Sequence, residues 1–276
     1  MGFLRRPGAS VRISPLAAKM AVELGVDVRN LPVIKGRIMS FHVMAASEEY
    51  RRMVTERRVP RSSWQKEIAQ RISESVDISP QITFDINVDM TALKSAKEDI
   101  IRGGIEVSYT DMVVKAVSAA LLLHPLLNCT IDGDHFIYRD YVNMGITVAL
   151  DGGAVVPVLH NVHAKTLAQI SAEVAGIVEK AKSGNFSPAL FTGGTFTIID
   201  FTLFTIESFT PIINQPQVAI LGMNKMANTP AIINGKIITR PTMKLSLVAD
   251  HRAVDGAIAA MFLGTLKEYL EQPLLA

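Results

Sequence analysis

Hydrophobic and polar residues alternate strictly in the stretch ITFDINVDM, residues 82–90. A period of two residues predicts a β-strand with one buried face, here formed by Ile82, Phe84, Ile86, Val88 and Met90. Shorter apolar runs bounded by turn residues predict further strands. We expect these strands near residues 136–150, 154–159, 195–200, 217–223, 231–238 and 243–250.

Helical spacing of apolar residues separates these strands. We expect helices near residues 64–76, 91–102, 110–123, 166–182 and 256–271. Ile68, Ile72 and Val76 share one face of the first helix, and the helix at 110–123 is apolar nearly all round and therefore buried. Strands and helices mix without a regular βαβ period. The pattern favours an α/β sandwich of two layers with a mixed or antiparallel sheet.

The first 60 residues have a different texture. Residues 1–12 are expected to be a flexible leader. A helix of about ten residues follows, with Ser14 as its N-cap, Pro15 in its first turn and Gly25 after its end. A helix this short needs packing partners, which makes 13–46 a small helical module or a docked arm. Residues 47–58 are rich in charge, which favours a linker or solvated surface over an anionic-ligand site. The main domain is expected at 59–276.

Composition limits the possible functions. The 276 residues are 49% hydrophobic, enough for a buried core, and the net charge of +2 is no footprint for nucleic acid. No stretch is long and apolar enough to span a membrane. The single cysteine, Cys129, excludes an intramolecular disulfide and is expected to be a buried small hydrophobe. No metal site is expected, because the histidines do not cluster at ligand spacings. We expect a cytoplasmic protein.

The stretch SLVADHRAVDGAIAAMF, residues 246–262, is the strongest candidate for chemistry. An alternating strand ends on Asp250 and His251, and Asp255 and Gly256 lead into the last helix. A lone histidine at a strand end is often only a hydrogen-bonded structural residue. The end of a rigid strand is also where a proton-transfer group can be held with little positional freedom.

The stretch 251–256, HRAVDG, resembles the HxxxDG motif of the dihydrolipoyl acyltransferases, the core components of 2-oxo acid dehydrogenase complexes, and of the related chloramphenicol acetyltransferases. Four other segments resemble the same enzymes in the same order, which favours the dihydrolipoyl branch and covers residues 59–276. They are QKEIAQRISES (65–75), NMGITVALDGGAVVPVLHN (143–161), GGTFTI (193–198) and SFTPIINQPQVAILGMNK (208–225). The resemblance implies a chloramphenicol acetyltransferase-like sandwich.

The resemblance also implies roles for the motif residues. The family transfers an acyl group between dihydrolipoamide and coenzyme A. A thiol with a pKa of about 8.5 is mostly protonated at neutral pH, and an imidazole with a pKa of about 6.5 can take its proton as sulfur attacks the thioester. His251 matches the family's base. Asp255 matches its aspartate and is expected to stabilise the geometry of the site.

The family's oxyanion donor is a serine in a GGTFTIS-type strand of a neighbouring subunit. This chain reads GGTFTIID, so that Ile199 stands where the serine would be. Isoleucine cannot donate a hydrogen bond. Either Thr197, Thr202 or Thr205 substitutes, with Asp200 beside them as a further substrate-binding candidate, or acyl transfer is slow, or much of the chemistry is lost. The second hypothesis is therefore a catalytically impaired scaffold of a 2-oxo acid dehydrogenase complex.

The N-terminal segment resembles the family's peripheral subunit-binding domain in ISPLAAKMAVELGVDVRNLP, residues 13–32. The later part keeps only Gly36, Arg37 and Ile38 of the family pattern, and His42 stands near the usual aspartate. Residues 13–46 are thus a possible binding site for partner dehydrogenases. No lipoyl domain is recognised, so the resemblance implies a lipoyl group supplied by a domain outside this chain.

The resemblance implies assembly as a homotrimer and then as a core of 24 or 60 subunits. In the family a C-terminal tail like LEQPLLA, residues 270–276, inserts into a neighbouring trimer. A tail folded onto its own domain is the alternative. Residues that lie far apart along the chain shape the pocket, and they select the acyl group.

Overall fold

The computed structural model describes residues 3–6, 9–33, 36–48, 58–150, 153–184, 187–233 and 235–273. The chain divides into two compact units, Met1–Arg61 and Ser62–Ala276. This division falls three residues after the boundary expected between 58 and 59. Most of the expected linker lies outside the described residues, as do Leu274 to Ala276 of the tail.

The first unit combines a small sheet with two short helices. Strands β1 (Phe3–Arg6) and β2 (Ala9–Ile13) are antiparallel, and β2 pairs in parallel with β3 (Arg37–Ile38). Strand structure thus occupies much of the segment for which the sequence predicts a flexible leader. Helices α1 (Pro15–Glu23) and α2 (Ser40–Ala46) and the 3-10 turn Val28–Asn30 complete the unit.

Local sequence explains the boundaries of α1 and α2. The Ser14 hydroxyl accepts a hydrogen bond from the backbone N–H of Ala17, and Gly25 takes a positive φ after the helix, as predicted. In α2 the buried His42 accepts a hydrogen bond at Nδ1 from the backbone N–H of Met39. The histidine at the usual aspartate position therefore satisfies a free N–H at the start of this helix.

The second unit is built on a six-stranded mixed sheet in the order β10-β7-β11-β12-β13-β4. Strand β11 is parallel to β7 and β12, and the other neighbours are antiparallel. The strands are β4 (Gln81–Asp89), β7 (Met144–Ile146), β10 (Val158–Leu159), β11 (Phe196–Asp200), β12 (Ala219–Ile233) and β13 (Lys236–Asp250). Two small hairpins lie outside this sheet, β5 (Thr130–Asp132) with β6 (His135–Ile137) and β8 (Val148–Leu150) with β9 (Gly153–Val155).

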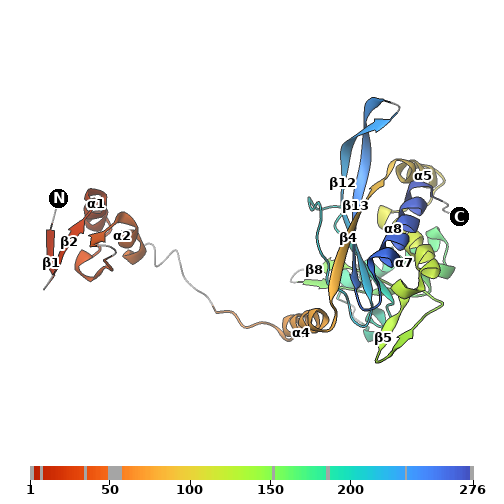
Figure 1. The fold of residues 1–276 in the computed structure, drawn as a ribbon, viewed down its shortest axis with the longest axis horizontal. Helices are drawn as coiled ribbons and strands as arrows, with labels where there is room; N and C mark the ends of the chain where they lie inside the picture. Colours follow the sequence, from red (N-terminus) through yellow and green to blue (C-terminus); the bar gives the residue numbers. More distant parts are fainter. Residues whose placement is uncertain are drawn as a thin grey trace. The chain divides into compact units, whose positions relative to one another are not determined.

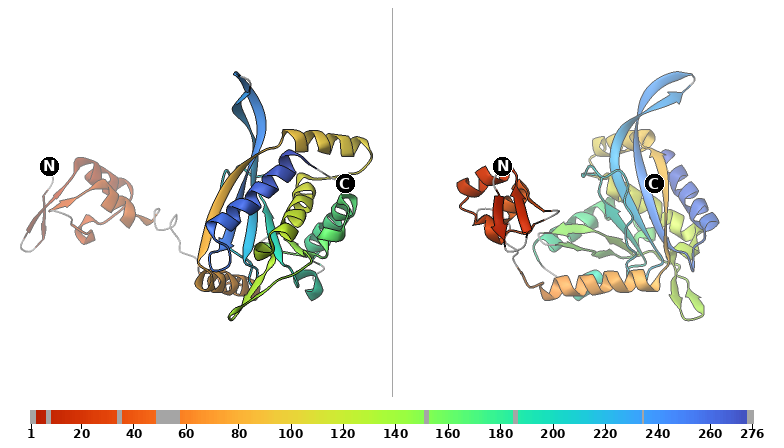
Figure 2. Two further views of the ribbon diagram at one scale, coloured as in Figure 1. Left: turned by 45° about the vertical axis from the view of Figure 1, so that its right-hand side comes forward. Right: turned by 60° about the vertical axis from the view of Figure 1, so that its left-hand side comes forward.

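Four helices cover one face of the sheet and form the second layer (Figure 2). They are α5 (Thr91–Arg102), α6 (Tyr109–Leu123), α7 (Leu167–Lys182) and α8 (Gly256–Glu271). The main core lies between these helices and the sheet, and α6 is its most deeply buried helix, as predicted. Helix α4 (Ser63–Ile78) lies apart from them, at the end of the sheet where β4 begins. The mixed α/β sandwich predicted from the sequence is confirmed.

The long hairpin of β12 and β13 differs from the expected strands. The sequence predicts separate strands at 217–223, 231–238 and 243–250, whereas the structure has two strands of 15 residues each. Pairing with β4 ends at Thr242, and Figure 1 shows β12 and β13 continuing beyond the rest of the sheet as a two-stranded ribbon. Both faces of such a ribbon meet solvent, so it carries no clear alternation of polar and apolar residues.

Candidate active site

The turn after β13 presents His251 at the surface. The His251 side chain is exposed, and its backbone N–H donates to the carbonyl of Pro80 at 2.9 Å. The N–H groups of Ala253 and Val254 both donate to the Asp250 carbonyl at 3.0 Å. Backbone hydrogen bonds therefore hold this turn at the end of the rigid β13 strand. An imidazole held in this way can accept a proton from a bound thiol.

The buried carboxylate of Asp250 stabilises the same turn by accepting hydrogen bonds from Arg252. Its side chain is 1% exposed and binds the Arg252 guanidinium through both oxygens, at 2.6–3.2 Å. Burial alone would raise the pKa of Asp250, but hydrogen bonds from Arg252 and Ser79 outweigh it, and the pKa lies below its ordinary value. In the sequence Asp250 and Arg252 are neighbours of His251, with no predicted role of their own. Their adjacency at the end of a buried strand is the sequence signal for this supporting role.

Asp255 lies at the end of this turn, where helix α8 begins. Its Oδ1 accepts a hydrogen bond from the backbone N–H of Ile258 at 2.9 Å, which makes it the N-cap of α8. The carboxylate is exposed. The cap fixes where α8 begins and therefore where the turn carrying His251 ends.

The predicted oxyanion and substrate-binding residues lie on strand β11, which carries Thr197 and Asp200, and on the loop after it, which carries Thr202 and Thr205. Thr197 is 1% exposed and donates to Gln217 Oε1 at 2.7 Å, so its hydroxyl is engaged inside the protein. Asp200 accepts from the Thr202 backbone N–H at 2.8 Å and from the Thr202 hydroxyl at 2.6 Å, and its other oxygen accepts from the Thr110 hydroxyl. Thr205 is exposed on the loop that follows. The structure brings Asp200 and Thr202 together and keeps Thr197 apart from them.

Ile199 packs into a small apolar cluster on the sheet face opposite the helices. Its partners are Ile213, Ile220 and Val248. Ile213 comes from the segment that crosses this face after β11, and the other two come from β12 and β13. The residue at the family's serine position is thus part of a hydrophobic contact rather than a hydrogen-bond donor.

The strand register separates His251 from Asp200 at the end of β11, whereas Thr197 is level with Ile220 and Val248, nearer the end of β13. Asp200 is level with Met223 of β12 and Leu245 of β13. Leu245 lies five residues before Asp250, which corresponds to about 17 Å along a strand at about 3.4 Å per residue. The histidine and the Asp200–Thr202 pair therefore lie toward opposite ends of the sheet in one chain.

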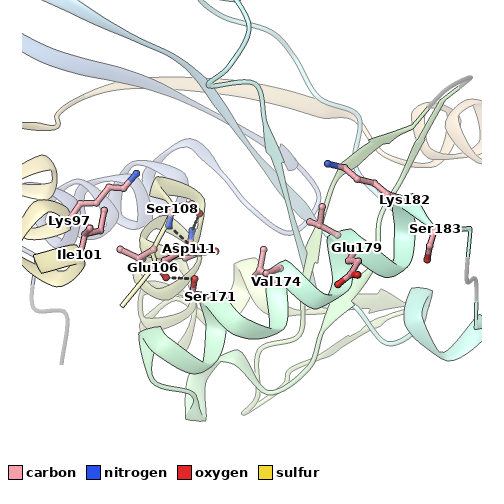
Figure 3. Close-up of a pocket in the computed structure, with 13 residues that line it drawn as sticks. Lys97, Ile101, Glu106, Ser108, Asp111, Ser171, Val174, Glu179, Lys182 and Ser183 are labelled. Carbon is pink, nitrogen blue, oxygen red and sulfur yellow. Dashed lines mark hydrogen bonds between the residues drawn. The ribbon is translucent and has the colours of Figure 1, made fainter. Parts of the chain in front are cut away.

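A groove of about 1000 Å³ lies between α5, α6 and α7 (Figure 3). It is lined by Lys97, Asp111, Val174 and Glu179 among others, and by none of the predicted site residues. Asp111 accepts at Oδ2 from the backbone N–H of Ser108 at 2.7 Å and forms a capping box with Ser108, the N-cap residue of α6. The groove is separate from the candidate site.

Cys129 and the search for a metal site or a membrane span point to no further chemistry in the described residues. Cys129 is fully buried, as predicted, and burial raises the pKa of its thiol to about 11. Among the residues that the structure describes, no group of three or more His, Cys, Asp and Glu side chains could hold a metal ion. Over the same residues, no helix has the length and apolar character that a bilayer crossing requires.

A family model covers the turn that carries HRAVDG together with the rest of the second unit. The catalytic-domain model of the 2-oxoacid dehydrogenases acyltransferase family matches residues 54–276. The chain belongs to this family. The resemblance inferred from the sequence motifs is confirmed, and the acyltransferase domain matches from a point five residues before the expected boundary at 59.

Curated relatives of this acyltransferase domain carry different acyl groups in their names. The succinyltransferase component of the 2-oxoglutarate dehydrogenase complex of Pseudomonas aeruginosa is 33% identical, over 96% of this chain and 72% of its own length. The acetyltransferase component of the acetoin cleaving system of Bacillus subtilis is 34% identical, over 95% and 70%. Both alignments include the N-terminal unit as well as the acyltransferase domain.

Solved structures of acyltransferases share the fold. A probable dihydrolipoamide acetyltransferase from Listeria monocytogenes superposes with a TM-score of 0.76 and 31% identity, covering 80% of this chain and 98% of that one. The cubic core of a pyruvate dehydrogenase multienzyme complex gives 0.75 and 31%, covering 81% and 95%. A chloramphenicol acetyltransferase gives 0.51 and 15%, covering 73% and 94%, which shows the same fold. The predicted chloramphenicol acetyltransferase-like fold is confirmed.

Proposed function

We propose that this chain transfers an acyl group between a dihydrolipoyl thiol and coenzyme A. The observation that carries the proposal is the exposed His251 on a hydrogen-bonded turn at the end of β13, within the residues that match the family model. Both named relatives are transferase components, which favours an enzyme over an inactive scaffold. Coenzyme A is a substrate here, and the lipoyl group comes from a domain outside residues 1–276.

His251 acts as the general base. It takes the proton of the coenzyme A thiol, and the thiolate sulfur attacks the thioester carbonyl carbon to give a tetrahedral oxyanion. When the intermediate collapses, the bond to the lipoyl sulfur breaks, and the leaving thiolate regains a proton from the imidazolium. Asp250 and Arg252 position the turn through their ion pair, in which the carboxylate is buried and the guanidinium is exposed. Asp255 positions it through the N-cap of α8.

The oxyanion requires a hydrogen-bond donor other than residue 199. The Thr197 hydroxyl is buried and donates to Gln217, so we assign the role to the exposed loop hydroxyl of Thr205 and to the half-buried hydroxyl of Thr202, which has to turn from Asp200 to the oxyanion in order to donate. Asp200 orients Thr202 through two hydrogen bonds. Because this loop and His251 lie toward opposite ends of one sheet, the complete site uses two copies of the chain. We further propose that the chain assembles into a trimer and then into a larger core. Residues 13–46 bind the partner dehydrogenases.

The test compares His251→Ala with His135→Ala, which removes another exposed histidine, on the β5–β6 hairpin. Removal of a general base is expected to lower acyl transfer to coenzyme A by about 100-fold. His135→Ala should keep wild-type activity. The measurement is thioester formation from acetyl, succinyl and branched acyl donors on dihydrolipoamide. Equal activity of His251→Ala and His135→Ala would overturn the assignment.

A further inference from the structure

Four uncharged polar side chains form a cluster beside the turn that carries His251. This polar cluster consists of Ser75 and Ser79 at the end of α4, Gln81 at the start of β4, and Gln215 in the segment before β12. Ser75 is 1% exposed and Ser79 is 3% exposed, and both glutamines are half-buried. Polar groups at this depth are costly unless they are hydrogen-bonded. Their hydrogen-bond partners therefore show what each of them holds in place.

One half of the polar cluster ends on the backbone of Ile213. The Ser75 hydroxyl donates to the Ile213 carbonyl at 2.6 Å, and Gln81 Oε1 accepts from the Ile213 N–H at 3.2 Å. Gln81 Nε2 donates to the carbonyl and to the hydroxyl of Ser75, both at 3.2 Å. These bonds hold the end of α4 against the segment before β12, and none of them involves the turn after β13.

The other half of the polar cluster ends on the carboxylate of Asp250. Gln215 Nε2 donates to Ser79 Oγ at 2.7 Å and makes a longer bond of 3.4 Å to Ser75 Oγ. Ser79 also hydrogen-bonds Asp250, which is ionised in its pair with Arg252. An ionised carboxylate only accepts hydrogen bonds, so the Ser79 hydroxyl donates to it. The amide of Gln215 therefore orients a hydroxyl that donates to Asp250.

Ser79 and the residue after it hold the turn on both sides of His251. The Asp250 carboxylate that binds Ser79 also accepts from the backbone N–H of Arg252 at 3.0 Å. Pro80 accepts from the backbone N–H of His251 at 2.9 Å. A proton-transfer group has to be held within a fraction of an ångström of its productive position. The position of His251 therefore depends on the Ser79 hydroxyl as well as on the ion pair of Asp250 and Arg252.

We propose that Ser79 and Gln215 are positioning residues for the acyl transfer. Gln215 orients the Ser79 hydroxyl, and this hydroxyl fixes the Asp250 carboxylate that holds the turn of His251. The inference rests on the proposed function, because it takes His251 as the general base. A displaced base destabilises the transition state without changing the binding of coenzyme A. Loss of either side chain therefore lowers kcat at constant KM.

The test measures kcat and KM for coenzyme A in variants of the full-length chain. Ser79→Ala removes the donor to Asp250 and should lower kcat about tenfold at constant KM. Ser79→Thr keeps a hydroxyl at this position and should keep most of the wild-type kcat. Gln215→Met keeps the length of the side chain without its N–H donor and should lower kcat about threefold. The double variant Ser79→Ala/Gln215→Met should be no slower than Ser79→Ala, because Gln215 acts through Ser79.

Gln81→Met is the matched control. It removes a half-buried amide from the half of the polar cluster that ends on Ile213. It should lower the free energy of unfolding in urea and keep the wild-type kcat. A normal kcat in Ser79→Ala, a rise in KM alone, or an equal loss of kcat in Gln81→Met would overturn the positioning role. Losses that multiply in the double variant would also overturn it.

The activity of His251→Ala separates this inference from the proposed function. Acyl transfer that His251→Ala abolishes and Ser79→Ala leaves intact would overturn the inference alone. Full activity of His251→Ala would overturn the proposed function, together with the inference that rests on it.

Discussion

Ile199 shows how one residue changes the meaning of a motif. From the sequence, isoleucine at the serine position removes a donor, and strand alternation places it on the same face as Thr197. Its burial against Ile213, Ile220 and Val248 could not be predicted, because Ile213 arrives from a loop whose path depends on tertiary packing. The structure therefore gives the substitution a stabilising role.

We expect Ile199→Ser to destabilise the protein. The change removes apolar contacts and leaves a hydroxyl in an apolar cluster, at a cost of about 1–2 kcal/mol, below the 2–5 kcal/mol of a fully buried isoleucine truncation because Ile199 is half-buried. Urea unfolding measures the effect, and Ile232→Ser on the exposed ribbon is the control, with a change below about 0.5 kcal/mol. Unchanged stability would refute the cluster, and a gain in acyl transfer would return the donor role to position 199.

At the level of elements, the spacing of apolar residues predicted where helices form, but not which helix faces are buried within the chain. The spacing of Ile68, Ile72 and Val76 correctly predicts the helix α4 and their shared face, and the structure adds that Ile72 and Val76 are exposed within this chain. Periodicity reports which residues share a face, and it does not report whether the covering surface belongs to the same chain. In the ribbon of β12 and β13, both faces of the strands meet solvent. These strands therefore lack the alternation of polar and apolar residues from which a strand is predicted.

The start of α8 separates a capping role from a chemical one for Asp255. Asparagine accepts the same hydrogen bond from Ile258 as aspartate does, whereas alanine does not. Asp255→Ala should lower the free energy of unfolding by about 1 kcal/mol, and Asp255→Asn should change it by only a few tenths. Thermal or urea unfolding of the three proteins checks this order. Equal losses in both variants would show that the cap is not what Asp255 contributes to stability.

At the level of the whole molecule, the sequence predicted the fold class and the family, and the resemblance implied a site shared between subunits, but the distance between the two halves within one chain could not be predicted. The motif at 251–256 and the strand at 193–200 are both visible in the sequence, but their distance depends on strand order and register. That register places Asp200 level with Leu245, several residues from the end of β13. Under the proposed function, the two halves that one chain carries therefore belong to two different sites.

Two defective chains should restore each other if the site forms between copies. His251→Ala lacks the base, and Thr202→Val/Thr205→Val lacks the proposed donors, so each variant alone should transfer acyl groups slowly. In mixed rings from equal co-expression, about one site in four combines an intact histidine with an intact loop, because each half is drawn independently from the two variants. Acyl transfer by the purified mixture should recover to about a quarter of the wild-type rate, and separately assembled variants mixed afterwards are the control. A mixture no more active than its parts would place both halves in one chain, and a fully active threonine variant would remove these hydroxyls from the reaction.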